Sequence, residues 1–264
     1  MLTAGPLVSA HRGGAGADRD RENTVEVLRE AVTVGCEYVE FDVQRCRDGV
    51  HVLHHHDHVL DGDRPVPVAE LTFAEFNALA DTHLLLTDAL DVLRERKKAH
   101  LDLESWPGPA GGGTAWPGHD VVLVEQVIGV LGAENVIVTT MEEESVRAVR
   151  AWSRSRYPDL LVGLSLGRDV GGRGLWRLAV TRGGELFPGR RLRRCDANLV
   201  VCHRTLARLR IAGWARRRGL PLLVWTVDEP AELRRWLADP RVWMVTTNFP
   251  RRAVELRREL ARGH

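Results

Sequence analysis

Residues 37–57 read EYVEFDVQRCRDGVHVLHHHD, and this stretch decides how the rest of the chain is interpreted. Two runs rich in β-branched residues, 37–43 and 50–54, predict strands. Only Asp48 and Gly49 interrupt them clearly, and a two-residue Asp-Gly loop is typical of an antiparallel hairpin. Such a hairpin would return residues 54–57 to the height of Glu40 and Asp42.

Outside this stretch, predicted strands and helices alternate along the whole chain. Because parallel neighbours need a crossover of roughly a dozen residues, the hairpin strand cannot belong to the parallel set. Eight parallel strands remain, which predicts an α/β fold, a TIM (β/α)8 barrel with a β-hairpin extension after strand 2 at its C-terminal face, in one domain over residues 1–264. The strands are expected at 7–10, 37–43, 100–104, 136–140, 160–166, 198–202, 222–227 and 242–246, and the helices at 24–34, 72–80, 87–98, 121–131, 142–152, 205–218 and 230–238.

Composition narrows the possible partners. The 264 residues carry 37 Lys and Arg against 36 Asp and Glu, a formal net charge of +1, so no global field favours nucleic acid. No apolar run approaches the roughly 18 residues of a membrane span, so stable membrane insertion is not expected. With no secretory signal pattern and four cysteines that form no C-x-x-C pair, we expect a cytoplasmic protein. The oligomeric state is not indicated.

Acidic residues are paired at two predicted strand ends. Glu40 and Asp42 share one strand face, and so do Asp102 and Glu104, because positions i and i+2 of a strand point the same way. Converging carboxylates repel one another unless a cation lies between them, and Mg²⁺ and Ca²⁺ prefer oxygen ligands. The alternative is that nearby arginines neutralise them. We predict a divalent metal site.

Histidines also occur at strand ends. His11 directly follows the first strand, and the cluster in the hairpin contains His54, His55 and His56. Imidazole is well suited to proton transfer near neutral pH, which favours acid/base catalysis. A zinc site is the alternative, but the His-x-His pattern common on strand one of zinc barrels is missing, since Arg12 and Gly13 follow His11.

Further candidates concern the substrate. The planar guanidinium of Arg12 could bind a phosphate. Trp225, at the end of a late strand, could form a pocket wall or belong to the barrel core. A Gly- and Pro-rich loop over residues 105–118 contains Trp106 and Trp116 and could act as a lid, and a Gly- and Arg-rich segment over 168–194 is either a solvated connection or a phosphate site.

Taken in order along the chain, these motifs resemble the glycerophosphodiester phosphodiesterase family. The resemblance rests on eight stretches. They are His11-Arg12-Gly13, Glu22-Asn23-Thr24, Glu40-Phe41-Asp42-Val43, Asp48-Gly49-Val50, His56-Asp57, the strand of Asp102, Val224-Trp225-Thr226-Val227-Asp228 and Thr246-Thr247-Asn248-Phe249-Pro250.

The resemblance implies a metal-dependent hydrolase that converts glycerophosphodiesters, small-molecule substrates, to glycerol 3-phosphate and an alcohol. It implies Glu40, Asp42 and Asp102 as metal ligands, His11 and His56 as the acid/base pair, and Arg12 as a phosphate contact. The chain departs from the family pattern at Glu104, where a lysine is usual, and at Asn248, where Asp is common.

We assign Glu104 to the metal site as well. Regular hairpin pairing would place His55, and not His56, opposite Asp42, which leaves open a bulge or His55 as the catalytic histidine. We place His55 with Arg12 and Trp225 among the substrate-binding residues. Two alternatives remain: a phospholipase D-type activity on lysophospholipid or sphingomyelin, and a barrel that binds phosphodiesters without turnover.

Overall fold

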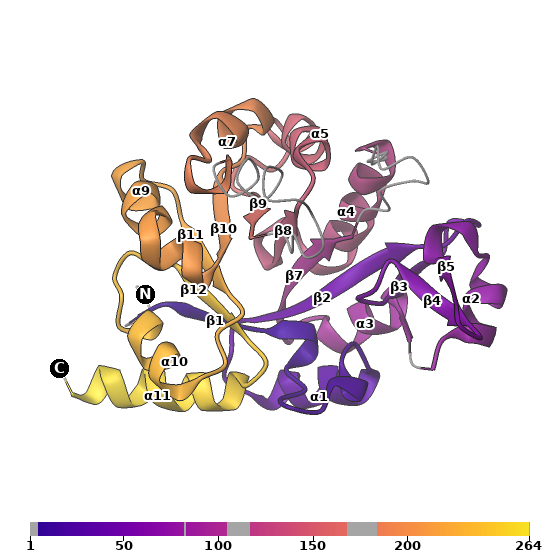
Figure 1. Cartoon of the computed structure of the whole chain (residues 1–264), viewed down its shortest axis with the longest axis horizontal. Coiled ribbons are helices and arrows are strands. Elements are labelled where there is room, and N and C mark those ends of the chain that lie inside the picture. The colour runs from indigo at the N-terminus through magenta and orange to yellow at the C-terminus, as the bar shows by residue number, and fades with distance from the viewer. Residues whose placement is uncertain (1–4, 82, 105–116, 168–183, 264) are drawn as a thin grey trace.

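Eight parallel strands close into a barrel in the computed structural model, which describes residues 5–81, 83–104, 117–167 and 184–263 (Figure 1). β1 pairs with both β2 and β12, so the ring is complete and the predicted TIM barrel is confirmed. The barrel strands are β1 (Leu7–Ala10), β2 (Tyr38–Arg45), β7 (Lys98–Leu103), β8 (Val136–Thr140), β9 (Leu161–Leu166), β10 (Leu199–His203), β11 (Leu222–Trp225) and β12 (Met244–Thr247).

Helices surround the barrel, and the longer ones pack an apolar face against it. Thr24 caps the first helix by accepting a hydrogen bond from the Val27 N–H, as the sequence predicts. No described helix is both long and apolar enough to cross a bilayer. The α-helices are α1 (Val25–Thr33), α2 (Phe73–Leu79), α3 (Leu86–Leu93), α4 (Pro117–Leu131), α5 (Glu143–Ser153), α7 (Gly189–Cys195), α8 (Arg204–Leu206), α9 (Ala212–Arg217), α10 (Pro230–Leu237) and α11 (Pro250–Arg262). Shorter helical turns are η1 (His11–Gly13), η2 (Arg19–Arg21), η3 (Val68–Glu70), η4 (Ala133–Asn135) and the π-helical η5 (Ala207–Ile211).

The predicted hairpin extends the sheet beyond the barrel, at the right of Figure 1. β3 (His51–Leu53) runs antiparallel to the end of β2, and β6 (Leu84–Leu85) pairs with β3. A second hairpin, β4 (His58–Asp61) and β5 (Arg64–Pro67), was not predicted. The loop between β2 and β3 differs from expectation: Cys46 N–H donates to the Val50 carbonyl, so three residues, not two, form the turn.

Three element predictions were wrong or incomplete. The third predicted helix was expected to reach residue 98, but α3 ends at Leu93, and Glu95 beyond it has a left-handed backbone (φ 60°). α7 forms where an irregular Arg-rich connection was expected. Its arginines Arg191 and Arg194 both pair with the single carboxylate of Glu143 on α5. α11 was not predicted, although Pro250 at its first turn is a typical helix start.

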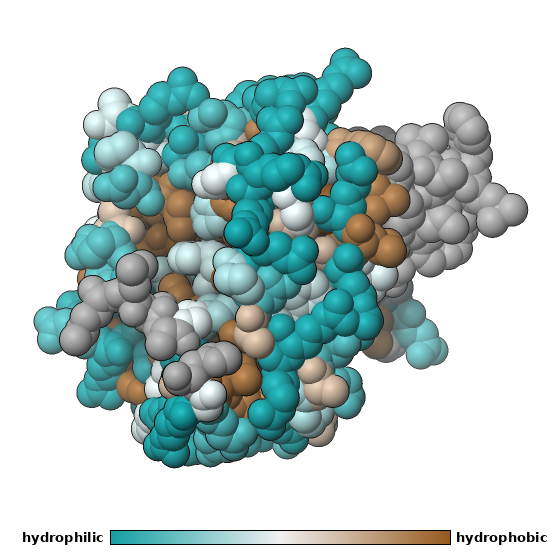
Figure 2. Space-filling model, turned by 90° about the vertical axis from the view of Figure 1, so that its left-hand side faces the viewer, coloured by the Kyte–Doolittle hydropathy of each residue, from teal (hydrophilic) through white to brown (hydrophobic). Residues whose placement is uncertain are grey.

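The core has two parts, one inside the barrel and one between the strands and the helices. Inside, apolar side chains such as Ile137, Leu223 and Met244 fill the N-terminal half. The residues above them, toward the carboxyl ends of the strands, are polar. Figure 2 shows one outer face, where hydrophilic residues predominate and hydrophobic ones form separate patches. All four cysteines are buried and unbonded.

Candidate active site

The turn after β1 brings the first predicted site residues to the mouth of the barrel. His11 and Arg12 lie in η1, where Arg12 has a left-handed backbone (φ 48°) and its N–H donates to Glu40 Oε2 at 2.7 Å. Gly13 also has a positive φ, and a Cβ there would lie 2.1 Å from a Val27 methyl carbon. Only glycine therefore lets this turn lie against α1.

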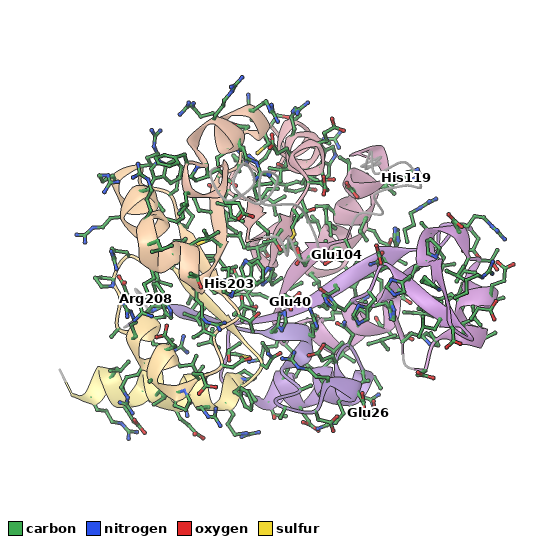
Figure 3. All side chains as sticks on the ribbon, in the orientation of Figure 1. Glu26, Glu40, Glu104, His119, His203 and Arg208 are labelled. Carbon is green, nitrogen blue, oxygen red and sulfur yellow. The ribbon has the colours of Figure 1, made fainter. Side chains whose placement is uncertain are left out.

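Three predicted metal ligands meet at the carboxyl ends of β2 and β7. Asp42 and Asp102 are partners in the parallel register, and Glu40 precedes Asp42 on the same strand face. One oxygen of each carboxylate lies within 4.8 Å of the others. Glu40 and Asp42 are each only 2% exposed, and Figure 3 places Glu40 near the centre of the molecule. Buried oxygen ligands at this spacing suit Mg²⁺ or Ca²⁺.

Burial and mutual repulsion change the pKa values of these acids. Burial first, and then the charge of Asp42, raise the pKa of Asp102 to about 7, and burial with both neighbouring charges raises the pKa of Glu40 well above its usual range. Burial also disfavours ionised Asp42, but His55 and Arg12 outweigh it and hold the pKa of Asp42 below its usual range. Arg12 alone does not offset the repulsion, so the group fits a divalent cation.

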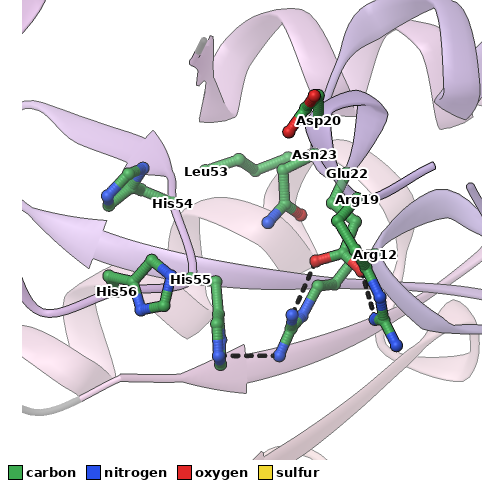
Figure 4. Close-up of a pocket in the computed structure, with 9 residues that line it drawn as sticks. All are labelled: Arg12, Arg19, Asp20, Glu22, Asn23, Leu53, His54, His55 and His56. Carbon is green, nitrogen blue, oxygen red and sulfur yellow. Dashed lines mark hydrogen bonds and ion pairs between the residues drawn. The ribbon is translucent and has the colours of Figure 1, made fainter. Parts of the chain in front are cut away.

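Arg12 links the carboxylates to the histidine cluster. Its Nε lies 3.0 Å from Asp42 Oδ2. Its Nη1 donates to Glu22 Oε2 at 2.6 Å, and its Nη2 lies 2.9 Å from His55 Nε2 (Figure 4). The amide of Asn23 donates to the same Asp42 oxygen at 3.1 Å. Because Arg12 can only donate, His55 Nε2 must be unprotonated, and neutral His55 carries its proton on Nδ1, 3.5 Å from Asp42 Oδ1.

Asn248 determines the tautomer of His11. The Asn248 amide nitrogen donates to Asp228 Oδ2 at 2.7 Å, so its oxygen faces His11 Nδ1 at 2.8 Å and must accept from it. His11 Nε2 is then the unprotonated nitrogen, 3.9 Å from Glu40 Oε2. Burial, and next the charge of Arg12, lower the pKa of His11 to about 4, so the ring is neutral near pH 7.

The hairpin places His55, and not His56, in contact with the carboxylates. His54 N–H donates to the Asp42 carbonyl at 3.2 Å, so the three-residue loop puts His54 opposite Asp42, where regular pairing had predicted His55. The chain leaves the strand there, and the His55 side chain turns toward Asp42. His56 is exposed, its carbonyl accepts from Gln44, and its ring borders a neighbouring pocket of about 400 Å³ (Figure 4).

A cavity of about 80 Å³ opens above the carboxylates at the mouth of the barrel. Trp225 is part of its wall, and the Trp225 ring packs edge-on against His203 at 5.6 Å. Burial, and then the charge of Asp102, raise the pKa of Glu104 well above its usual range. The cavity is lined by every predicted site residue except His56, namely His11, Arg12, Glu40, Asp42, His55, Asp102, Glu104 and Trp225.

Sequence reasoning missed the polar side chains beneath the ligands. Ser9, His100 and Thr139 are buried inside the barrel under Asp102. A signal was present: Ser9 shares a strand face with His11, and His100 shares one with Asp102. Asn248 was noted only within a motif, and its contact with His11 could not be foreseen from residues so far apart in the sequence. Trp106 and Trp116, the predicted lid anchors, lie outside the described residues.

Comparison with known proteins places these features in a family. The sequence model of the glycerophosphoryl diester phosphodiesterase family matches residues 11–163, which is more than half of the chain. A curated relative, the glycerophosphocholine phosphodiesterase of Eremothecium gossypii, is 36% identical over 76 residues. That segment is 29% of this chain, and the chain spans only 6% of the length of the relative.

Solved structures share the fold. A glycerophosphodiester phosphodiesterase from Parabacteroides distasonis superposes with a TM-score of 0.72 at 18% identity, covering 97% of this chain and 98% of that one. A phosphodiesterase from Oleispira antarctica in complex with the product sn-glycerol-3-phosphate superposes with a TM-score of 0.68 at 17% identity, covering 96% of each chain. With the barrel, the three clustered carboxylates and the match over residues 11–163, this chain belongs to the glycerophosphoryl diester phosphodiesterase family.

Proposed function

We propose that this protein hydrolyses small glycerophosphodiesters to glycerol 3-phosphate and an alcohol. The observation that carries the proposal is one cavity bordered by three clustered carboxylates and two histidines whose proton positions are set by their neighbours. The curated relative is a glycerophosphocholine phosphodiesterase, and one structural neighbour holds sn-glycerol-3-phosphate, which supports the same substrate class.

The two histidines suit opposite roles. His11 exposes an unprotonated Nε2 and is neutral near pH 7, so it can accept a proton as general base. His55 lines the same cavity and can act as general acid in its imidazolium form, once Arg12 has turned from His55 Nε2 to the substrate phosphate and that nitrogen carries a second proton. His55 thus takes the role that the family resemblance implied for His56.

We assign two steps to this pair. Neutral His11 removes the proton of the substrate's glycerol 2-hydroxyl, whose oxygen bonds to phosphorus. The bond to the head-group oxygen breaks, and the imidazolium of His55 gives its proton to the departing alkoxide. The product is a cyclic phosphate. Water then opens the ring: a P–O bond forms to the water oxygen, the bond to the 2-oxygen breaks, and the two histidines exchange roles and return to their starting states.

Glu40, Asp42 and Asp102 would hold the divalent cation, Mg²⁺ or Ca²⁺ rather than Zn²⁺ because all three ligands are hard oxygens. When bound, the cation would supply stabilisation of the negative charge that develops on the phosphate oxygens. Arg12 lines the same cavity and would orient the phosphate. The unbonded buried thiols suit a reducing compartment, so we retain the cytoplasm as the proposed location.

The test follows release of glycerol 3-phosphate from glycerophosphocholine and glycerophosphoethanolamine with EDTA, Mg²⁺, Ca²⁺, Mn²⁺ or Zn²⁺. Release should require a divalent ion and disappear in Asp42→Asn. Folded wild-type protein that releases no product with any ion would contradict the proposal and favour a barrel that only binds phosphodiesters.

A matched pair of variants tests the assignment of the general acid. His55→Ala should lose about 10²–10⁴ in kcat, the usual contribution of one acid/base group. His56→Ala, one residue along and outside the cavity, should stay within about threefold of wild type. The reverse pattern would return the role to His56.

A further inference from the structure

A buried row of polar side chains runs beneath the carboxylates, from β1 through β7 to β8. Ser9 Oγ lies 3.1 Å from His100 Nδ1, and His100 Nε2 lies 3.0 Å from Thr139 Oγ1. Thr139 Oγ1 in turn lies 2.7 Å from Asp102 Oδ1. Ser9, His100 and Thr139 are each no more than 3% exposed. Asp102 is therefore joined to the interior of the barrel by three consecutive hydrogen bonds.

The donor and the acceptor of each hydrogen bond in this row can be assigned by starting from Asp102. An ionised carboxylate can only accept, so the Thr139 hydroxyl donates to Asp102. The Thr139 oxygen must then accept from His100 Nε2–H. A neutral imidazole has a single N–H, so His100 Nδ1 accepts from the Ser9 hydroxyl. Each polar atom in the row is therefore either a donor or an acceptor to each neighbour. The Thr139 hydroxyl that donates to Asp102 Oδ1 is itself fixed by its hydrogen bond from His100.

A nearby buried threonine lacks a comparable partner in the part of the chain that the structure describes. Thr246 on β12 lines the same cavity and is 1% exposed, yet its hydroxyl has no hydrogen-bond partner among the described residues. Thr139 differs from Thr246 in that it contacts a proposed metal ligand.

We propose that Thr139 and His100 are positioning residues, which hold Asp102 in the orientation that a divalent cation requires and leave its remaining lone pairs free for that cation. The inference rests on the proposed function for the role of Asp102 as a ligand. Neither residue needs to touch the substrate. Partners that orient a metal ligand in this way typically contribute 10- to 100-fold to metal affinity.

The experiment measures binding of Mg²⁺ and Ca²⁺ to the full chain by titration calorimetry without substrate. Thr139→Val removes the hydroxyl at almost constant shape and should weaken binding about 10- to 100-fold. Thr139→Ser retains the hydroxyl and should restore binding to within about threefold of wild type. Thr246→Val is the matched control and should bind the ion like wild type. Equal affinity in wild type and Thr139→Val, both folded, would overturn the proposal.

Nitrogen NMR of the histidine rings gives a readout independent of affinity. With a divalent ion present, His100 should show a protonated Nε2 and an unprotonated Nδ1, and the opposite tautomer would contradict the inferred directions. These measurements distinguish failure of the proposed metal site from failure of the positioning role. Wild-type protein that binds no ion removes the proposed metal site and this inference with it. Wild-type binding that Thr139→Val matches removes only the positioning role.

Discussion

Asn248 acts on the reaction through a single hydrogen bond. Its oxygen accepts from His11 Nδ1, and Asp228 holds the amide in that orientation. Asn248→Ala should let His11 adopt either tautomer, so the fraction with a free Nε2 falls. We expect kcat to decrease, by at most the 10²–10⁴ that a general base contributes, with little change in folding. Asn248→Asp keeps an acceptor oxygen and should retain more activity. Steady-state kinetics on both variants would show this, and equal rates in both would contradict it.

Ionisation of Glu104 should lower the stability of the folded protein. Its pKa is raised because the carboxyl group is buried beside Asp102 and Asp42, so the folded state holds the proton more tightly than the unfolded chain. A group with a raised pKa destabilises the protein as pH rises above the unfolded value. In EDTA, Glu104→Gln should therefore unfold at a higher temperature than wild type, with a difference that is small near pH 4 and grows toward pH 8.

Melting curves of both proteins over this pH range test the expectation. The comparison with wild type cancels the opposite effect of buried His11, whose lowered pKa destabilises the protein as pH falls. Asp20→Asn, at an exposed carboxylate beside the neighbouring pocket, is the control. A pH-independent difference for Glu104→Gln would show that this carboxyl group is not repelled by its neighbours.

At the scale of single elements, the η1 turn depends on Gly13. A Cβ would overlap Val27, and the positive φ (80°) is unfavourable for any other residue. Gly13→Ala should cost more than about 2 kcal/mol in unfolding free energy and should shift Arg12, whose N–H bonds Glu40. Gly62→Ala is matched, because Gly62 also has a positive φ (62°) but open space around it, and should cost only about 1 kcal/mol. Denaturant unfolding of both variants distinguishes overlap from backbone strain.

The strands and the site residues on them were largely predictable from the sequence. Alternation of strands and helices predicted the barrel and all eight of its strands because periodicity is a local property. The same reasoning placed Glu40, Asp42 and Asp102 together, since parallel neighbours present their carboxyl ends at one edge. It left the choice between His55 and His56 open, because the side chain that faces the site depends on the turn geometry and on how the chain leaves the strand.

Contacts between distant segments were beyond reach for a different reason. Asn248 meets His11 across 237 residues of sequence, and nothing local in either segment indicates the other. The prediction of a single domain over residues 1–264 stays a prediction, as does the choice between Mg²⁺ and Ca²⁺. Residue type was enough to predict the chemistry of the site. The hydrogen-bond partners that orient each side chain could be identified only from the closed barrel.

At the scale of the whole molecule, the proposed cation would join two neighbouring strands. Its ligands are carboxylates on β2 and β7, which repel one another without it, and β7 pairs with β2 along the whole length of β7. A ligand that binds only the folded state at 100 times its Kd stabilises it by about 2.7 kcal/mol. For a chain of this size, that corresponds to a rise of roughly 5–10 °C in Tm.

Adding saturating Mg²⁺ or Ca²⁺ to EDTA-treated protein should produce this rise, and hydrogen exchange should slow most in β2 and β7 because the ion holds those strands together. Asp42→Asn should abolish both effects, since Asp42 contributes to the ligand group from the strand that carries Glu40. Asp57→Asn, outside that group, should keep both. Stabilisation of Asp42→Asn equal to that of wild type would mean that the ion binds elsewhere, and the buried carboxylates would then need another source of positive charge.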